Sequence, residues 1–370
     1  MGAFIYVLDP PPLLSVGINA APLLAPRTGV GRYIAGLLES LAAHPVPDLR
    51  CIALFAPRAA VQSPNGALVR ATSLVRAFVK RLPASYDLAQ AARSATLAAR
   101  RDLSLYHETN HAAPRFRGPV VVTIHDLSTI RFPETQEPAR ARHFARALRE
   151  GAGRAARIVT PTEAIAREAV ELLGLSRDRI RAIPHGVGPA FTPDGARRPW
   201  RRAYVLYVGA LNARKGLDTL LDAFSALPER LRREHDLLLA GPRERGAPDL
   251  RDATLLGYVP DADLPALLRG AAACCYPSRY EGFGLPLLEA MACGVPCVAS
   301  DDPALVEVAG GAALHARRAD PAALAAALER ALDDQTVRAD LSRRGPARAS
   351  TFTWERSASE HLRVYREALA

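Results

Sequence analysis

Two carboxylates, Glu281 and Glu289, lie eight positions apart in the segment YEGFGLPLLE. Gly282 and Gly284 leave the backbone after Glu281 uncovered, so that amide N–H groups can approach an anion near a helix N-terminus. Pro286 suits the first turn of that helix, where its missing N–H costs nothing. We expect Glu289 near the end of this first turn, facing whatever the turn binds. The pattern indicates a phosphate cradle flanked by two hydroxyl-binding carboxylates, which is the chemistry of a nucleotide-sugar site.

The flanking sequence places this segment at the edge of a parallel sheet. AAACCYPS, residues 271–278, is typical of a buried strand, and Gly294 followed by VPCVAS predicts a helix C-cap and the next strand. Parallel α/β units bind ligands at the carboxyl ends of their strands. This context favours a binding site, although an E-x7-E spacing and a glycine before a helix also occur by chance in ordinary turns.

Two other strand-end loops in the second half of the chain carry candidate binding residues. Arg214 and Lys215 follow the strand-like run AYVLYVG. Two adjacent cations before a helix can neutralise a diphosphate; the alternative is a helix-start loop with solvated charges. Lys215 is one of only two lysines in an arginine-rich chain, which favours a requirement for a compact point charge. The turn Gly257-Tyr258-Val259 is expected to line the nucleotide base, unless its tyrosine only packs.

The first half of the chain contributes two further groups. The strongly β-prone run VVVTIHD ends in His125 and Asp126. A histidine there is expected to point into a cleft between domains; the alternative is a histidine that only hydrogen-bonds a nearby carbonyl. Gly29 and Gly31, in TGVGR after the first strand, open a helix where bare backbone can approach a phosphate, although such a G-x-G pair is often only a tight turn.

Two series of strand-like segments, interleaved with helical patterns, must position these residues. The first is SVGINA, CIALFA, LSLYHET, PVVVTIHD, RIVTPT and RAIPHGV; the second is AYVLYVG, HDLLLAG, ATLLGYV, AAACCYP, VPCVAS and AALHA. This alternation predicts parallel sheets with helices on both faces. Segment 191–199, with two prolines and a glycine, has linker composition. We therefore expect an α/β protein with two Rossmann-like domains facing across a cleft, 1–190 and 200–351, and a C-terminal helix, 352–370, that crosses back to the first domain.

Two motifs imitate metal sites. The segment from His107 to His111 spells H-E-x-x-H, which binds zinc only when both histidines share a helical face. Here it closes a strand-like run and meets Pro114 almost at once, so a helix is not expected. The D-x-D formed by Asp261 and Asp263 precedes LPALLRG and is interpreted as a helix N-cap. We expect neither a metal ion nor a cofactor.

The composition is that of a globular protein with an anionic partner. The 370 residues are 49% hydrophobic and 23% charged, with a formal net charge of +10. No apolar run approaches the roughly 20 residues that span a bilayer. The prolines in MGAFIYVLDPPPLLSV and its lack of a basic n-region argue against a signal peptide. Five cysteines without a C-x-x-C pair favour core thiols in a reducing compartment, so we expect a cytoplasmic protein.

Basic residues gather between Arg70 and Arg101, against a single acid, Asp87. Apolar positions within 68–82 follow helical spacing, which is typical of a basic amphipathic helix on a membrane surface or against a partner. The alternative is a helix docked on the first domain with solvated arginines. Segment 68–101 is therefore a candidate contact with an anionic membrane, on its cytoplasmic face.

With this organisation, the region around Glu281 resembles the donor-site signature of glycosyltransferase family 4, retaining enzymes of the GT-B fold that generally bind no metal. GINAAPLLAPRTGVGRY, TIHDLSTIRFPE and YEGFGLPLLEAMACGVP are similar to the bacterial mannosyltransferase-type subgroup, which builds lipopolysaccharide O-antigen and other cell-surface polysaccharides. The resemblance runs from Gly17 to about Phe352. It implies transfer of a hexose, mannose or D-rhamnose, from a GDP-sugar to a hydroxyl of a lipid-linked glycan, with the anomeric configuration retained.

The resemblance also implies a role for each candidate residue. His125, Asp126 and Glu281 are expected at the reacting sugar, where His125 positions the donor without acting as nucleophile. Glu289 is expected to bind the ribose hydroxyls. The donor diphosphate is expected to meet Gly29, Gly31, Arg214, Lys215 and the amides of Gly282, Phe283, Gly284 and Leu285. Several relatives carry an arginine directly after the strand's glycine; here that position is Ala210, so Arg214 and Lys215 carry the cationic contacts alone.

Two other kinds of function stay open from the residues. A nucleotide-sugar epimerase or hydrolase of the same architecture would act on the donor without an acceptor. A basic module for nucleic acid or membrane would depend on the arginines of 70–101 and tolerate the loss of Glu281. The glycosyltransferase interpretation instead expects a nucleotide-sugar donor and a lipid-linked oligosaccharide acceptor, and no nucleic acid.

Overall fold

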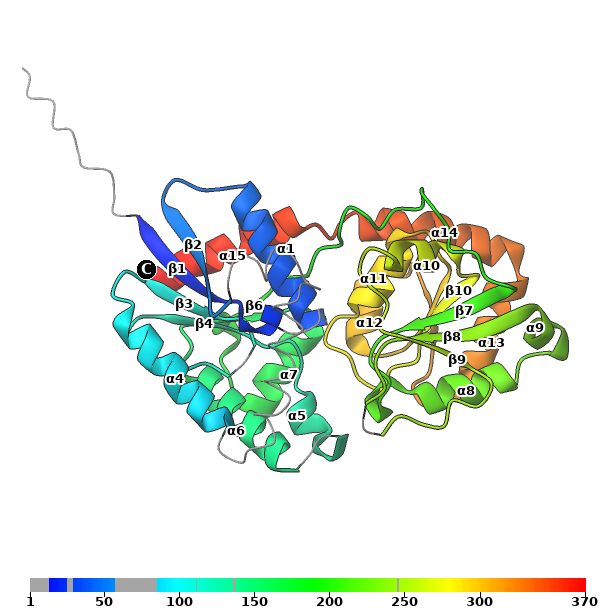
Figure 1. Ribbon diagram of the computed structural model, residues 1–370, viewed down its shortest axis with the longest axis horizontal. Helices are drawn as coiled ribbons and strands as arrows, with labels where there is room; N and C mark the ends of the chain where they lie inside the picture. Colours follow the sequence, from blue (N-terminus) through cyan, green and yellow to red (C-terminus); the bar gives the residue numbers. More distant parts are fainter. Residues whose placement is uncertain (1–12, 25–28, 57–84, 111, 136–137, 245) are drawn as a thin grey trace, which may run out of the picture.

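The computed structural model describes residues 13–24, 29–56, 85–110, 112–135, 138–244 and 246–370. Two six-stranded parallel sheets stand side by side, each with helices on both faces (Figure 1). The predicted α/β arrangement of two parallel sheets is confirmed. Half of the basic segment 68–101, up to residue 84, lies outside the described residues, so its membrane contact stays a prediction.

The first sheet contains six strands: β1 Leu14–Asn19, β2 Leu49–Leu54, β3 Leu105–Glu108, β4 Val120–Thr123, β5 Arg157–Thr160 and β6 Ile180–Ala182. Its helical elements are η1 Ala21–Leu24, α1 Gly29–Ala43, α4 Ser85–Ala99, α5 Ser128–Arg131, η2 Pro133–Thr135, α6 Pro138–Arg154, α7 Glu163–Leu173 and η3 Arg177–Arg179. The strand order is β2-β1-β3-β4-β5-β6. The run VVVT of β4 is buried at every position because helices cover both faces of the sheet.

The second sheet contains β7 Ala203–Val208, β8 His235–Ala240, β9 Thr254–Gly257, β10 Ala273–Tyr276, β11 Cys297–Ser300 and β12 Leu314–Ala316. Its helical elements are η4 Ala213–Lys215, α8 Leu217–Ser225, α9 Glu229–Glu234, α10 Leu264–Gly270, α11 Leu285–Ala292, α12 Pro303–Ala309, α13 Pro321–Asp333 and α14 Gln335–Ala349. The strand order is β12-β11-β10-β7-β8-β9. Segment 191–199 between the sheets forms neither helix nor strand, in agreement with its linker composition.

The last helix, α15 Trp354–Leu369, packs against α1 and strands of the first sheet, whereas α14, which precedes it, lies with the second domain (Figure 1). His361 hydrogen-bonds the hydroxyl of Tyr33 on α1 at 2.9 Å, and the hydroxyl of Tyr365 lies 2.8 Å from His107 Nδ1 on β3. The chain therefore returns to the domain in which it began.

Apolar side chains pack on both faces of each sheet and give each domain its own core. Four of the five cysteines are buried in the second domain, and all five are free thiols. Gly294, in the left-handed conformation with φ of 71°, follows the end of α11, as predicted from the sequence. Among the described residues, no helix combines the length and apolar character that crossing a bilayer requires.

Candidate active site

Loops from the carboxyl ends of strands in both sheets meet at the interface between the two domains. We call this interface the seam. The carbonyl oxygen of His125, after β4, lies so close to Gly282, after β10, that a Cβ on that glycine would be 1.9 Å away. Thr162 Oγ1 donates to the carbonyl of Gly282 at 3.0 Å. The amide of Leu127 donates to the hydroxyl of Tyr280 at 2.8 Å. The candidate residues of the two halves are therefore neighbours.

The glycine-rich turn before α11 differs in part from its sequence interpretation. The Cα of Gly282 is covered, because it packs against the first domain. Only glycine fits there. Gly284 has φ of 94°, and a Cβ would meet Leu305 at 2.5 Å. The side chains of Phe283 and Leu285 are buried in the core of the second domain. In the part of the chain that the structure describes, the amides of residues 282–285 donate to no protein acceptor, and they lie at a helix N-terminus that favours an anion.

Lys215 and Glu281 form a partly buried ion pair between the loops after β7 and β10, with each side chain 15% exposed. Lys215 Nζ donates to Glu281 Oε1 at 2.6 Å, and Ser278 Oγ donates to the same oxygen at 2.8 Å. Arg214 donates to the carbonyl of Tyr280 at 2.8 Å and lies 3.9 Å from Glu281 Oε2. Burial raises the pKa of Glu281, but the charges of Lys215 and Arg214 and the hydrogen bonds outweigh it. The net pKa lies below its ordinary value, so the carboxylate is ionised at neutral pH.

His125 and Asp126 reach this ion pair from the first domain. The charge of Asp126 acts on both Arg214 and Lys215. His125 Nε2 hydrogen-bonds the carbonyl of Thr109 at 2.8 Å, so the hydrogen bond to a nearby carbonyl that the alternative interpretation expected does form. Because a carbonyl only accepts, Nε2 carries the proton and Nδ1 is left as the acceptor. Burial lowers the pKa of His125, which keeps the ring neutral at pH 7. Its contact with a sugar stays a prediction.

Glu289 lies in the second turn of α11, because the helix begins at Leu285; the sequence placed it in the first turn. Its side chain is 3% exposed and is held by Arg32 of α1, whose Nη1 donates to the two carboxylate oxygens at 2.9 and 2.8 Å. Arg32 Nη2 donates to Asp261 Oδ1 at 2.9 Å. Sequence reasoning missed Arg32, which lies 257 positions from Glu289; its place directly after Gly31 was the only signal.

Gly29 and Gly31 lie in the first turn of α1, and Arg32 follows them. The structure therefore brings this glycine segment to the E-x7-E helix through the contact of Arg32 with Glu289. Thr28, which opens the motif, lies outside the described residues. The binding of a diphosphate by this turn stays a prediction.

The turn after β9 lies on the same side of the seam as Glu289. Gly257 has φ of 68°, and its carbonyl accepts from the amide of Gly241 at 2.7 Å. Tyr258 is 41% exposed and acts electrostatically on Arg32, whereas Val259 is buried. This turn and the predicted ribose carboxylate therefore share one neighbour, Arg32.

The described parts of the two motifs that resemble metal sites lie in ordinary secondary structure. His107 lies on β3, where its ring nitrogens contact the hydroxyls of Tyr365 and Thr123, each at 2.8 Å, so the helix that a zinc protease needs is not formed. His111 lies outside the described residues. Asp263 occupies the predicted N-cap position of α10, but its side chain makes no capping hydrogen bond. Among the residues that the structure describes, no three His, Cys, Asp or Glu side chains gather as a metal site.

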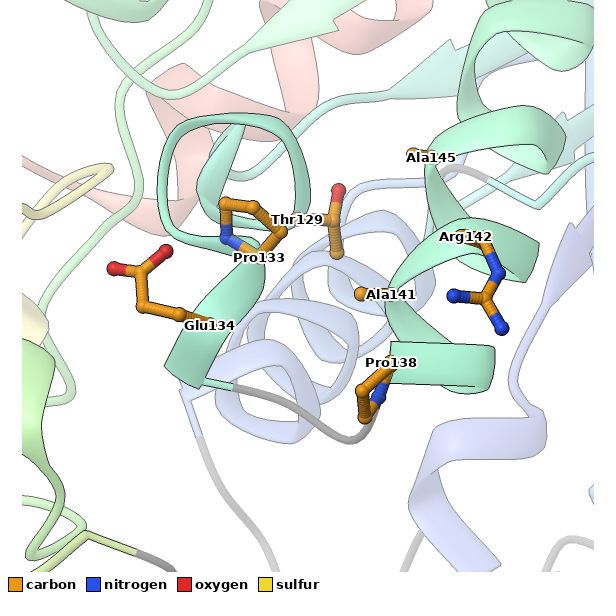
Figure 2. Close-up of a pocket in the computed structure, with 7 residues that line it drawn as sticks. All are labelled: Thr129, Pro133, Glu134, Pro138, Ala141, Arg142 and Ala145. Carbon is orange, nitrogen blue, oxygen red and sulfur yellow. The ribbon is translucent and has the colours of Figure 1, made fainter.

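A pocket of about 320 Å³ opens on the first domain beside α5, which begins two residues after Asp126 (Figure 2). Its walls come from α5, η2 and the start of α6. The lining is mostly apolar, with one acid and one arginine: Thr129, Pro133, Glu134, Pro138, Ala141, Arg142 and Ala145. The short helix that follows Asp126 thus forms one wall of a pocket on the first domain.

Comparison with known proteins gives one family match in each half of the chain. The family model described as Glycosyltransferase Family 4 matches residues 27–191, and the one described as Glycosyl transferases group 1 matches residues 194–348. The O-antigen chain mannosyltransferase B of Escherichia coli is 33% identical over 377 residues, which cover 93% of this chain and 97% of that protein.

Solved structures resemble the whole chain in fold. Sucrose-phosphate synthase from Thermosynechococcus elongatus superposes with a TM-score of 0.71 at 21% identity, covering 96% of this chain and 98% of its own. Anabaena HepE, solved in complex with UDP-glucose, gives a TM-score of 0.67 at 16% identity, with 95% and 99% covered. The expected GT-B fold is confirmed.

Proposed function

The chain belongs to glycosyltransferase family 4, and from this premise we propose that it moves a mannosyl or D-rhamnosyl unit from a GDP-sugar to a hydroxyl of a lipid-linked glycan. We propose O-antigen or another cell-surface polysaccharide as the product. The support is the likeness to the mannosyltransferase of E. coli, which extends over 93% of this chain. Because the chain is a glycosyltransferase, a purely binding module is set aside.

The observation that carries the proposal is the partly buried pair of Lys215 and Glu281 beside Arg214. A departing diphosphate develops negative charge, and Lys215, Arg214 and the amides of residues 282–285 are available to stabilise it. When Lys215 turns to the diphosphate, Glu281 becomes free to accept hydrogen bonds from sugar hydroxyls, while Ser278 still holds one of its oxygens. One preformed pair thus supplies both the cation and the anion that a nucleotide sugar requires.

The proposed transfer retains the anomeric configuration, as is expected of the family. The acceptor hydroxyl attacks the anomeric carbon on the face from which the diphosphate leaves. The carbon–phosphate-oxygen bond breaks, the new glycosidic bond forms, and the hydroxyl proton passes to the departing phosphate oxygen. His125, neutral and fixed through Nε2, orients the sugar with Nδ1 as an acceptor. Closure of the seam excludes the water that would otherwise hydrolyse the donor.

The acceptor is proposed to bind the first domain. The pocket beside α5 supports this placement, because its mostly apolar lining suits a hydrophobic part of a lipid-linked glycan (Figure 2) and α5 begins two residues after Asp126. A location on the cytoplasmic face of a membrane is part of the same proposal. We also propose that transfer needs no metal ion, since Arg214, Lys215 and the helix amides take the place of a metal clamp.

The test is to incubate the purified protein with GDP-mannose, with and without a lipid-linked glycan, and to follow both sugar products. The proposal expects a glycan longer by one sugar, dependent on the acceptor, and a new linkage with the donor's anomeric configuration. Release of free sugar at the same rate without acceptor would identify the hydrolase alternative. A parallel binding screen with GDP-, UDP-, ADP- and dTDP-sugars identifies the base.

A further inference from the structure

The contact between Arg32 and Glu289 has no part in the transfer step described above. Arg32 belongs to α1 of the first domain, and Glu289 to α11 of the second. Their side chains are 18% and 3% exposed. Because a single nitrogen of Arg32 serves both carboxylate oxygens, each oxygen keeps a lone pair for another donor. The second nitrogen is fixed by Asp261, so the guanidinium cannot rotate freely.

We propose that Arg32 is a positioning residue for the donor's ribose, holding Glu289 ionised and aimed at the ribose hydroxyls from the opposite domain. This inference rests on the proposed function, in which Glu289 binds the ribose. It adds that the ribose site is completed by α1, so that the nucleotide binds fully only where the seam is closed.

The surroundings of Glu289 explain why it needs a cation. Burial raises the pKa of Glu289, Arg32 lowers it and Asp261 raises it, and the net pKa is about 7. Tyr276 and Cys293 also face Glu289, but burial raises their own pKa values, to about 11 for Cys293, so both stay neutral from pH 6 to 9. Among the described groups that act on Glu289, Arg32 is therefore the one positive charge.

Loss of Arg32 leaves Glu289 buried beside the negative charge of Asp261. An opposite charge in direct contact lowers a carboxyl pKa by about one to three units, so its removal should raise the pKa of Glu289 to about 8 or higher. At pH 7 the carboxyl would then be protonated. A protonated carboxyl loses the charge-assisted hydrogen bonds that it accepts from ribose hydroxyls, and these are about twice as strong as neutral ones.

The experiment is calorimetry of GDP binding to the wild type and Arg32→Gln at pH 6, 7, 8 and 9. We compare the two proteins by the dissociation constant of Arg32→Gln divided by that of the wild type. If only ionised Glu289 binds ribose, this ratio should be about five at pH 7 and approach a constant low value at pH 9. The terminal phosphate of GDP titrates near pH 6, but this is common to both proteins and cancels in the ratio. Arg32→Lys keeps a cation and should restore most of the wild-type pH profile.

Two control variants separate this role from a structural one. Adding Glu289→Gln to Arg32→Gln should remove the pH dependence of the ratio, because no titrating carboxyl is left. Arg230→Gln, at an exposed ion pair on α9, should leave GDP affinity unchanged at every pH. A ratio for Arg32→Gln that is the same at pH 7 and pH 9 would overturn the inference while leaving the proposed function intact. Failure of the wild type to bind any nucleoside diphosphate would overturn both.

Discussion

Gly282→Ala tests whether the seam must close for transfer to occur. The substitution adds one methyl group at the point where the second domain touches the carbonyl oxygen of His125. The added Cβ would lie 1.9 Å from that oxygen, whereas real Cβ contacts are essentially never under 3.0 Å. The obstacle is backbone and not the end of a flexible side chain, so no rotamer change removes it.

The domains must therefore separate by about 1 Å at this point, which also weakens the hydrogen bond from Thr162 Oγ1 to the carbonyl of Gly282. A displacement of about 1 Å in the alignment of reacting groups lowers a rate by about 100-fold. The clash lies at the contact between the domains, so overpacking should reduce the free energy of unfolding by only about 1–3 kcal/mol.

The assay compares kcat for transfer, the affinity for GDP and Tm in the wild type, Gly282→Ala and Gly153→Ala. Gly153 lies on α6, where an added Cβ meets nothing within 4 Å, so that variant should keep wild-type activity. We expect Gly282→Ala to lose about two orders of magnitude in kcat and to bind GDP more weakly than the wild type, because the ribose site is completed across the seam. Transfer by Gly282→Ala within a few-fold of the wild type would refute the requirement for a closed seam.

The two carboxylates and the acceptor pocket give further expectations. Glu281→Gln should impair transfer but leave GDP affinity nearly unchanged, because GDP lacks the transferred hexose; Glu289→Gln should weaken GDP and donor binding together, because both carry the ribose. Equal affinity losses in calorimetry would contradict this division. Transfer should survive exhaustive chelation, and restoration of a lost activity by manganese would instead revive Asp261 and Asp263 as ligands. Ala145→Trp should raise KM for the acceptor several-fold without changing GDP affinity; an unchanged KM would remove the pocket from the acceptor site.

Much of the fold follows from local patterns. The strands of both sheets are short apolar runs, such as VVVT in β4 and ACCY in β10, whose every side chain is buried because helices cover both faces. Parallel strands joined by helices bring their carboxyl ends to one edge, which is why the sequence placed the loops of Arg214 and Glu281 together. His125 follows a strand of the other sheet and was expected to face the cleft between the domains.

The contacts across the seam were not predictable in the same way. Gly282 is needed because the carbonyl of His125 approaches it, a restriction that no periodicity encodes. Arg32 is 257 positions from Glu289, and an arginine after a glycine-rich turn has the same local pattern whether it is solvated or paired. The position of Glu289 has a local cause: α11 begins at Leu285, directly after Gly284 with φ of 94°, so Glu289 is the fifth helical residue and lies just past the first turn.

The most direct test of the central claim, that the pair of Lys215 and Glu281 is the donor site, is the transfer rate of Lys215→Met. Loss of one preorganised stabiliser of a leaving anion costs about 3 kcal/mol in the barrier, so the rate should fall by about 100-fold. Glu281 would keep its hydrogen bond from Ser278 and the nearby charge of Arg214, so Tm should change little. Arg230→Met, at the exposed pair on α9, is the control and should keep its activity. Transfer by folded Lys215→Met within a few-fold of the wild type would contradict the claim.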